Sequence, residues 1–354
     1  MPHVITEPGA VDTEWLTGVL RRCRAGWAGH VTAVEVEAER SLPYSRTARL
    51  KIRYSEPPPG PLPKHLFLKL SPVPSDGEKP PENGSEIDFY RTAASEMNAP
   101  PLARCYDAEF SAQLGSSHLL LEDLSASHFQ TQQAKHPSPL HSELAVKCLA
   151  RFHAHWWEHP KIGKEIGKVF DKQWLDSFLI NLEVSVVKFL EFRGDSLSTE
   201  QRHAYDLMLR SSRPIWGRLT DAAGLTVTHG DTHWWNFFHA NDPGIEETRI
   251  IDWQLWHIDQ GPRDLAFLIA LGGFAERRPE MEAHLIDTYY KTLIECGVRN
   301  YSRVDFWQDY RRSAIRNLNI PVIFWSQGKH PTTWQGALER AFQSYNELKC
   351  CELL

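Results

Sequence analysis

The sequence lacks the features that mark membrane and secreted proteins. It contains no apolar run of about 18 residues, the length that a membrane-spanning helix needs. Its first residues do not combine a basic segment with an apolar one, as a secretory signal would. The six cysteines are scattered and form no Cys-x-x-Cys pair, which argues against a disulfide framework and a zinc knuckle. We therefore expect a cytoplasmic protein that does not enter a membrane.

The sequence also lacks the basic charge typical of proteins that bind nucleic acid. Its formal net charge is −6, and charged residues are spread through both halves of the chain. At 354 residues it is longer than one small core requires, which favours two lobes. We expect a small-molecule partner and no nucleic acid.

The first third of the chain has the pattern of a small β-rich lobe. Alternating apolar and polar residues predict strands within 31–54, and short apolar runs predict strands at 66–70 and 116–124. Helical periodicity is present at 11–27 and 85–97.

The remainder of the chain is predicted to be mainly helical. Helical periodicity covers 139–159, 173–193, 199–217, 278–297, 303–318 and 333–349. A β-like patch interrupts these helices at 225–230 and 248–253. The expected fold class is α+β, with an N-terminal, mostly antiparallel lobe at 1–121 and a larger helical lobe at 122–354.

The strongest chemical signal is the segment His-Gly-Asp-Thr-His-Trp-Trp-Asn at 229–236. Asp231 and Asn236 follow a short apolar run, and Asp252 ends a second one. Phosphoryl transfer needs a carboxylate that orients or deprotonates the acceptor hydroxyl, together with oxygen ligands for Mg²⁺ on the nucleotide phosphates. One Asp followed by an Asn and a later Asp provides these groups.

Upstream residues supply candidates for nucleotide binding. Lys69 lies inside an apolar run, where an ammonium needs an anionic partner, and Glu86 opens the next predicted helix. Such a pair would place the lysine on the α- and β-phosphates. The segment Leu121, Glu122, Asp123 and Leu124 would cross between the lobes, and its backbone would contact the adenine edge.

These motifs resemble the aminoglycoside phosphotransferase and choline kinase superfamily, and most closely its ecdysteroid kinase-like branch. The double signature is His-Gly-Asp-x-x-x-x-Asn followed by Ile-Asp-Trp-Gln, and the segment GPRDLAFLIA at 261–270 resembles the part that usually follows. The resemblance covers roughly residues 40 to 270. It implies a protein-kinase-like two-lobe fold and an enzyme that uses ATP and Mg²⁺ to phosphorylate a hydroxyl of a small molecule.

The resemblance also implies roles for single residues. It makes Asp231 the catalytic base and His229 a structural hydrogen-bonding residue of the catalytic loop. Asn236 and Asp252 become magnesium ligands. Lys69 becomes the phosphate-binding lysine, Glu86 its partner, and Asp264 a support that ties the catalytic loop down.

One segment departs from the pattern of the family. The loop that covers the phosphates in kinases is normally rich in glycine, because backbone N–H groups must approach the phosphates closely. Here the corresponding turn, residues 41–47, contains no glycine. Ser45, Arg46 and Thr47 are expected to contact phosphate through their side chains instead.

Two other hypotheses remain open at this point. His229, Asp231 and His233 alternate in His-x-Asp-x-His and, with Asp252, would suit a metal-dependent hydrolase. A catalytically silent kinase-like fold that only binds a ligand is the second alternative.

The acceptor is not identified by a motif. The helical segments 160–220 and 275–350 are expected to build its site, and they carry many aromatic residues. The candidates are a metabolite, a steroid-like alcohol or an antibiotic. The aromatic content favours a larger, partly apolar alcohol.

Overall fold

The computed structural model describes residues 3–23, 27–42, 45–55, 62–71, 84–132, 137–221, 223–242, 244–245, 247–272 and 279–354. Contacts within the chain define two compact units. Unit 1 comprises Met1–Phe129 and Phe238–Gln254, and unit 2 comprises Gln130–Phe237 and Leu255–Leu354. The lobe boundary expected between residues 121 and 122 stays a prediction.

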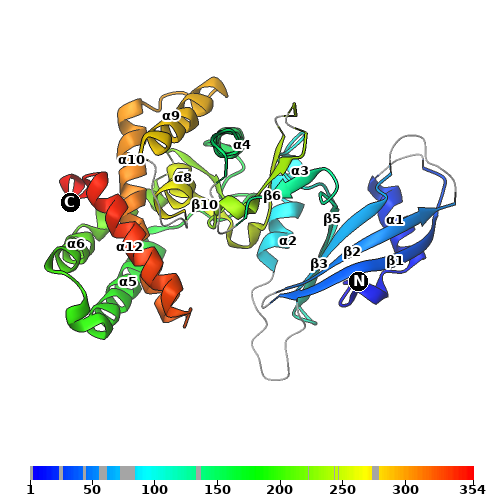
Figure 1. Cartoon of the computed structure of the whole chain (residues 1–354), viewed down its shortest axis with the longest axis horizontal. Coiled ribbons are helices and arrows are strands. Elements are labelled where there is room, and N and C mark those ends of the chain that lie inside the picture. Colours follow the sequence, from blue (N-terminus) through cyan, green and yellow to red (C-terminus); the bar gives the residue numbers. More distant parts are fainter. Residues whose placement is uncertain are drawn as a thin grey trace. The chain divides into compact units, whose positions relative to one another are not determined.

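Unit 1 is built on an antiparallel sheet with the strand order β1-β2-β3-β5-β4 (Figure 1). Its strands are β1 (Val31–Leu42), β2 (Ser45–Tyr54), β3 (His65–Leu70), β4 (Cys105–Ser111) and β5 (Ser116–Glu122). The helices of this unit are α1 (Thr13–Cys23), α2 (Gly84–Arg91) and α3 (Ala93–Glu96). The strands expected in the first third of the chain are confirmed, and β4 is an additional edge strand. The expected helix at 85–97 is divided into α2 and α3, because the backbone at Thr92 departs from helical geometry.

Alternation along β3 decides which residues of the sheet face the core. Leu66, Leu68 and Leu70 are buried in a cluster that includes residues of α1, and burial of each contributes about 2 kcal/mol. Lys69 therefore points to the opposite face. In the ladder it lies between Thr47 of β2 and Leu119 of β5, in the interior of the sheet.

A smaller sheet, with the order β6-β8-β9, lies mainly in unit 1. It consists of β6 (His128–Gln130), β8 (Phe237–Ala240) and β9 (Thr248–Ile250). Ile250 of β9 also forms a parallel bridge with Leu102, and its N–H donates to the carbonyl of Pro101 at 2.9 Å. These bonds fix the chain immediately before Asp252.

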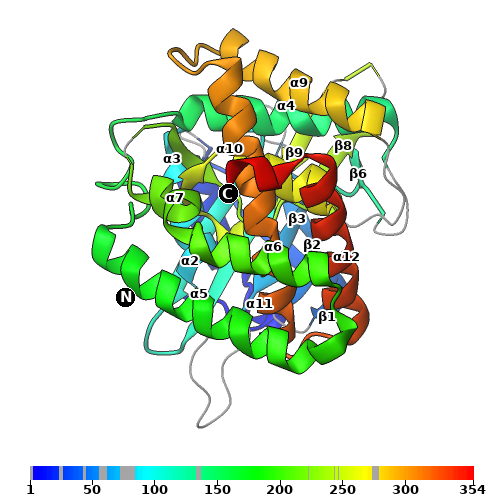
Figure 2. The ribbon, with the colours of Figure 1, turned by 90° about the vertical axis from the view of Figure 1, so that its left-hand side faces the viewer.

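Unit 2 is mainly helical. Its helices are α4 (Pro139–Trp156), α5 (Lys172–Arg193), α6 (Thr199–Arg210), α7 (Ser212–Trp216), α8 (Pro262–Ala266), α9 (Pro279–Glu295), α10 (Arg303–Arg316), α11 (Ile320–Ser326) and α12 (Pro331–Glu347). A π-helix at Phe267–Leu271 continues α8. Figure 2 shows the long helix α5 beside α6. A large apolar cluster joins residues of α5, α6, α10, α11 and α12.

The structure also corrects one expected helix of unit 2 and confirms most of the others in that unit. The segment 199–217 is not one helix, because α6 ends at Arg210 and α7 starts at Ser212. Pro214 gives the reason, since proline lacks the N–H that a continuous helix would use and is tolerated in a first turn. Side-chain caps begin other helices, such as Asp171 at α5 and Ser302 at α10.

The predicted β-like patch forms short strands, one of which directly precedes the loop that carries Asp231. In unit 2, β7 (Leu225–Thr228) pairs antiparallel with β10 (His257–Gln260), and Thr228 lies opposite His257. The predicted strand at 248–253 corresponds to β9. In the described part of the chain, no helix is long and apolar enough to span a membrane.

Candidate functional site

Three residues that are distant in the sequence form an ion cluster in unit 1. The Nζ atom of Lys69 lies 2.8 Å from Oε2 of Glu86 and 2.7 Å from Oδ1 of Asp252. Lys69 and Glu86 are largely buried, whereas the Asp252 side chain is 42% exposed. A buried charge must be paired to offset the cost of its desolvation, and the two carboxylates meet this requirement for the ammonium of Lys69.

Helix α2 is also bound directly to the chain that follows Asp252. Oε1 of Glu86 accepts a hydrogen bond from the backbone N–H of Trp253 at 3.2 Å. The ring of Phe89, one helical turn after Glu86, stacks on Trp253 with centroids 4.0 Å apart and planes 5° apart. Asp252 itself has a φ of 68°, a left-handed conformation that Asp tolerates better than most residues. The cluster is thus held by side chains and backbone together.

The charge state of Lys69 follows from these contacts. Burial alone would lower the pKa of Lys69, because it penalises the ammonium. The carboxylates of Glu86 and Asp252 outweigh this effect and hold the pKa above its usual value. Lys69 therefore stays a cation at neutral pH.

In unit 2, the loop that carries Asp231 is tied down by one buried carboxylate. Asp264 accepts hydrogen bonds from the backbone N–H groups of His229 at 2.6 Å and Gly230 at 3.0 Å. The hydroxyl of Thr232 donates to the backbone carbonyl of Asp264 at 2.8 Å. The structure therefore agrees with the expected role of Asp264 as a support of this loop.

His153 of α4 completes the surroundings of Asp264. Its Nε2 lies 3.2 Å from Oδ2 of Asp264, and its Nδ1 lies 2.6 Å from the hydroxyl of Tyr289. Since a carboxylate only accepts, Nε2 donates and Nδ1 can accept from the tyrosine. Burial would raise the pKa of Asp264, but the hydrogen bond from His153 and the loop N–H groups outweigh it and lower that pKa.

The carboxylate of Asp231 has a histidine as its partner. Nε2 of His233 lies 3.0 Å from Oδ1 of Asp231, and the His233 ring stacks on Trp235 at 4.2 Å. Burial would raise the pKa of Asp231, yet the hydrogen bond from His233 outweighs it and keeps the pKa below its usual value. Asp231 is therefore ionised at neutral pH and can accept a proton.

Asn236 is oriented by the same loop. Its Nδ2 donates to the backbone carbonyl of Asp231 at 2.9 Å, and the residue is buried. Because the amide nitrogen makes this bond, the amide oxygen of Asn236 is not used by it. The backbone N–H of Asn236 donates to the carbonyl of His233, which closes a short 3₁₀ turn at Trp234–Asn236.

Gly230 is required where it stands. Its φ is +82°, and a Cβ atom added there would lie 2.2 Å from the carbonyl oxygen of Leu255. A side chain at this position would meet both a strained backbone and a clash with main-chain atoms. The glycine before Asp231 thus lets the loop pack directly on the chain before β10.

The residues expected to cover the phosphates have other partners in the structure. The guanidinium of Arg46 pairs with Glu39, and the hydroxyl of Thr47 donates to the carbonyl of Arg40 at 3.5 Å. Ser45 lies opposite Leu42 in the β1–β2 ladder. Residues 43 and 44 of the predicted turn lie outside the described residues.

The segment expected to contact adenine lies at the end of β5. Leu121 and Glu122 belong to this strand, and the carboxylate of Asp123 accepts from Nε of Arg49 at 2.7 Å. The carbonyl of Leu124 accepts from the N–H groups of the next turn, at 127 and 128. The side chain of Asp123 is thus structural, which leaves ligand contacts to the backbone.

The hydrolase hypothesis requires a cluster of metal-binding side chains. Among the described residues, no group of three or more His, Cys, Asp or Glu side chains could hold a metal ion. His233 pairs with Asp231, and Nδ1 of His229 accepts from the N–H of Asp231 at 3.2 Å. These histidines organise the loop.

Two contacts went beyond what the sequence indicated. The pairing of His233 with Asp231 has a weak signal in the sequence, namely a histidine two residues after the predicted base. The contact of Phe89 with Trp253 has none, because it joins segments far apart in the chain.

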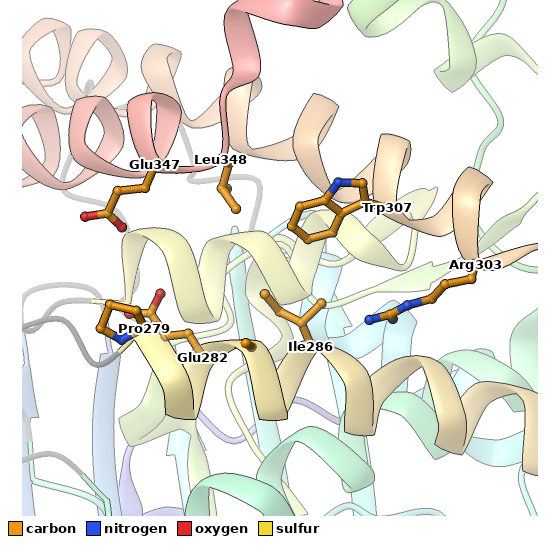
Figure 3. Close-up of a pocket in the computed structure, with 8 residues that line it drawn as sticks. Pro279, Glu282, Ile286, Arg303, Trp307, Glu347 and Leu348 are labelled. Atoms are coloured by element: carbon orange, nitrogen blue, oxygen red, sulfur yellow. The ribbon is translucent and has the colours of Figure 1, made fainter.

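A separate pocket of about 380 Å³ lies on unit 2 between α9, α10 and the end of α12 (Figure 3). Glu282, Ile286, Arg303, Trp307, Glu347 and Leu348 line it. It falls within the segment 275–350 that was expected to bind the acceptor. None of the residues singled out as catalytic lines it.

Solved structures with the same fold are small-molecule kinases and related proteins. A predicted aminoglycoside phosphotransferase from Ralstonia eutropha is 14% identical, with a TM-score of 0.57 over 96% of this chain and 98% of that one. The choline kinase LicA from Streptococcus pneumoniae is 12% identical, with a TM-score of 0.50 over 94% and 98%. A spectinomycin phosphotransferase solved with ADP and spectinomycin is also 12% identical, with a TM-score of 0.50 over 95% and 99%. The expected protein-kinase-like fold class is confirmed.

A family model gives the more specific relationship. No curated protein matches the sequence. The model of the ecdysteroid kinase-like family matches residues 86–299, more than half of the chain. This stretch contains the Asp231 loop, Asp252 and Asp264. The chain therefore belongs to the ecdysteroid kinase-like family, a phosphotransferase family of small-molecule kinases.

Proposed function

We propose that this chain is an ATP- and magnesium-dependent kinase that transfers the γ-phosphoryl group of ATP to a hydroxyl of a small molecule. The observation that carries the proposal is the ion cluster of Lys69, Glu86 and Asp252. Its members come from β3, α2 and the segment after β9. The pair of Lys69 with Glu86 already satisfies the buried ammonium, so the second carboxylate, on half-exposed Asp252, points to a role beyond stability. The cluster matches the lysine, glutamate and aspartate that kinase chemistry requires.

Lys69 is assigned to the α- and β-phosphates. Glu86 holds the ammonium from one side and is itself fixed by the N–H of Trp253, so the lysine is oriented before a nucleotide arrives. A preorganised cation costs little reorganisation when the phosphates bind. The raised pKa of Lys69 ensures that it carries its charge there.

Asp231 is assigned as the base. It accepts the proton of the acceptor hydroxyl while that oxygen forms a bond to the γ-phosphorus and the bond to the leaving ADP oxygen breaks. Its lowered pKa and its ion pair with His233 favour the ionised form that this step needs. The bonds from Asp264 to the loop backbone hold the carboxylate in place.

Asn236 and Asp252 are assigned as the magnesium ligands. An amide oxygen and a carboxylate are hard oxygen donors, and Mg²⁺ typically takes only one or two carboxylates from the protein beside phosphates and water. This donor set fits magnesium better than zinc. When bound, the ion would neutralise charge on the phosphate oxygens.

The remaining contacts to the nucleotide are assigned to backbone and flanking residues. The backbone of Leu121, Glu122, Asp123 and Leu124 would bind the adenine edge. Arg46 would have to leave Glu39 to reach a phosphate, whereas Ser45 and Thr47 offer hydroxyls. The fold neighbour solved with ADP supports the choice of an adenine nucleotide.

A larger, partly apolar alcohol is proposed as the acceptor. The support is the membership of the ecdysteroid kinase-like family and the aromatic content of the helical unit. An acceptor panel that includes a sterol-like alcohol, kanamycin and choline tests this class. A much higher kcat/KM for choline or kanamycin than for every apolar alcohol would contradict it.

The proposed reaction is tested by ATP turnover in wild type and in Asp231→Asn. Loss of the base should lower turnover by about 10²- to 10⁴-fold, whereas affinity for Mg-ATP should stay near the wild-type value. A matched control is Asp206→Asn, at an exposed ion pair with Arg210 of α6, which should leave turnover unchanged.

Each alternative predicts a different result. A silent kinase-like fold would bind Mg-ATP without turnover in wild type. A metal-dependent hydrolase would ignore ATP and lose stability when a chelator is added. Near-normal turnover of Asp231→Asn would refute the assignment of the base.

A further inference from the structure

His257 lies directly beside the loop that carries Asp231. It is the first residue of β10 and pairs in the ladder with Thr228, the last residue of β7, after which the loop begins. The hydroxyl of Thr228 donates to the His257 carbonyl at 2.8 Å. The backbone of His257 is therefore fixed, and its ring position is determined by the two groups it contacts.

Both ring nitrogens of His257 face groups that can only accept. Nδ1 lies 2.9 Å from the carbonyl oxygen of Leu255, and Nε2 lies 3.4 Å from Oδ2 of Asp259. Asp259 is fully buried and is bound by two nitrogens of Arg316 at 3.0 and 2.6 Å, so it is a carboxylate. A neutral imidazole donates only one hydrogen bond, so the ring serves both partners only as an imidazolium.

The carbonyl that His257 holds is the one against which Gly230 packs. A Cβ atom added to Gly230 would lie 2.2 Å from the Leu255 oxygen and 3.1 Å from Nδ1 of His257. Gly230 immediately precedes Asp231. The contacts therefore run from Arg316 through Asp259 and His257 to the Leu255 carbonyl, and from there to the backbone beside the proposed base.

We propose that His257, as an imidazolium, is a positioning residue that holds the Leu255 carbonyl against Gly230 and thereby aligns Asp231, so that its deprotonation lowers turnover at alkaline pH. This inference rests on the proposed function. It adds a residue that none of the motifs in the sequence contains.

The charged groups around His257 favour its protonated form. Asp259 lies on β10 and Asp264 on α8, and both carboxylates favour the charged ring. The cation of this network is Arg316 of α10, which binds the other side of the contact through Asp259. Burial would lower the pKa of His257, but Asp259 in particular outweighs it and raises the pKa. About a third of the side chain, 34%, is exposed, so the ring can exchange protons with solvent.

The sign of the pH effect follows from the raised pKa. The imidazolium is fully formed below the ordinary histidine pKa of about 6.5 and persists above it. Turnover should therefore be highest below the ordinary histidine pKa and fall as the pH rises through the raised pKa of His257.

The first experiment measures the charge itself, without reference to activity. The ring signal of His257 is followed by NMR in the full chain labelled on histidine and is assigned by its loss in His257→Asn. A midpoint clearly above the ordinary histidine value of about 6.5 is expected. A midpoint at or below that value would overturn the proposal.

The second experiment measures Mg-ATP turnover against pH as release of inorganic phosphate, with water as the acceptor. Wild type should show an alkaline limb at the midpoint found by NMR. His257→Asn keeps a donor near the Nδ1 position but cannot titrate, so it should retain most turnover at neutral pH and lose that limb. His257→Ala should lower kcat about five- to tenfold with little change in KM for ATP.

The control and the contrary outcomes separate the two proposals. His284→Asn should keep the wild-type profile, because His284 is an exposed residue of α9 whose ring contacts Glu143 of α4, away from the Asp231 loop. A wild-type profile that is flat across the midpoint, or an unchanged limb in His257→Asn, would overturn the positioning role and leave the proposed function intact. No turnover by wild type at any pH would overturn both.

Discussion

At the scale of single residues, each buried charge of the candidate site has a specific partner. Lys69 has Glu86 and Asp252, and Asp264 has the loop N–H groups and His153. Burial of an unpaired charge is costly, so removal of one partner leaves the other as an uncompensated charge and destabilises the folded protein. These residues therefore contribute to stability as well as to the proposed chemistry.

Replacement of Lys69 by methionine should destabilise the protein. Lys69→Met leaves the buried carboxylate of Glu86 without its cation, and the free energy of unfolding should fall by about 3 kcal/mol. Urea denaturation measures the change. Lys147→Met, at a half-buried surface pair with Glu143 on α4, is the matched control and should change stability by no more than about 0.5 kcal/mol. Equal effects in the two variants would contradict the account of the cluster.

At the scale of elements, the proposed base lies on a loop that follows one strand and packs on the chain before another. The β7–β10 ladder fixes both ends of this arrangement, and Asp264 at the start of α8 binds the loop backbone. The loop therefore needs a residue without a side chain at Gly230.

Substitution of Gly230 should distort the loop. In Gly230→Ala the new Cβ would lie 2.2 Å from the Leu255 oxygen at a φ of +82°, so turnover should fall at least tenfold and stability by about 2 kcal/mol. Gly217→Ala is the control, because nothing lies within 4 Å of its Cβ position. Thermal unfolding and ATP turnover check both variants. A fully active Gly230→Ala would show that the loop does not depend on this contact.

The sequence predicts these elements well where a local pattern defines them. Alternation predicted β1 and β2, a short apolar run predicted β3, and helical periodicity predicted most helices of unit 2 to within a few residues. The order of Lys69 and Glu86 suggested that they pair, and the structure shows this ion pair; the second pair, of Lys69 with Asp252, was not expected. The roles assigned to these residues stay predictions.

Other features had no local signal. The short strands β6, β8 and β10 are stabilised by pairing with distant segments, which a pattern along the chain does not contain. The positive φ of Asp252 and the contacts of His257 with Leu255 and Asp259 likewise depend on tertiary packing. These features emerge only when the elements are assembled.

At the scale of the whole molecule, buried ion pairs link stability to pH. The pKa of Asp264 and that of Asp259 are lowered in the folded chain, in spite of burial, by His153 and by Arg316 respectively. Such groups contribute stability that is fully present above their unfolded pKa of about 4 and is lost as the pH falls below it. The raised pKa of His257 acts in the opposite sense, so its contribution is lost as the pH rises.

The free energy of unfolding should therefore decrease on both sides of neutral pH. We expect a loss between about pH 5 and pH 3 from the carboxylates, and a smaller loss at alkaline pH from His257. Urea denaturation at several pH values measures both. Asp259→Asn should be less stable at pH 7 and show a shallower acid limb than wild type. An acid limb of unchanged slope in this variant would contradict the role of Asp259.

The central claim, a magnesium-dependent nucleotide site, is tested most directly by a thermal-shift titration with ATP in the presence and absence of Mg²⁺. A ligand that binds only the folded state raises the melting temperature in proportion to its occupancy. We predict an upward shift with ATP that depends on Mg²⁺ and is reduced in Asp252→Asn. No shift with ATP and Mg²⁺ together, at concentrations that saturate related kinases, would contradict the account.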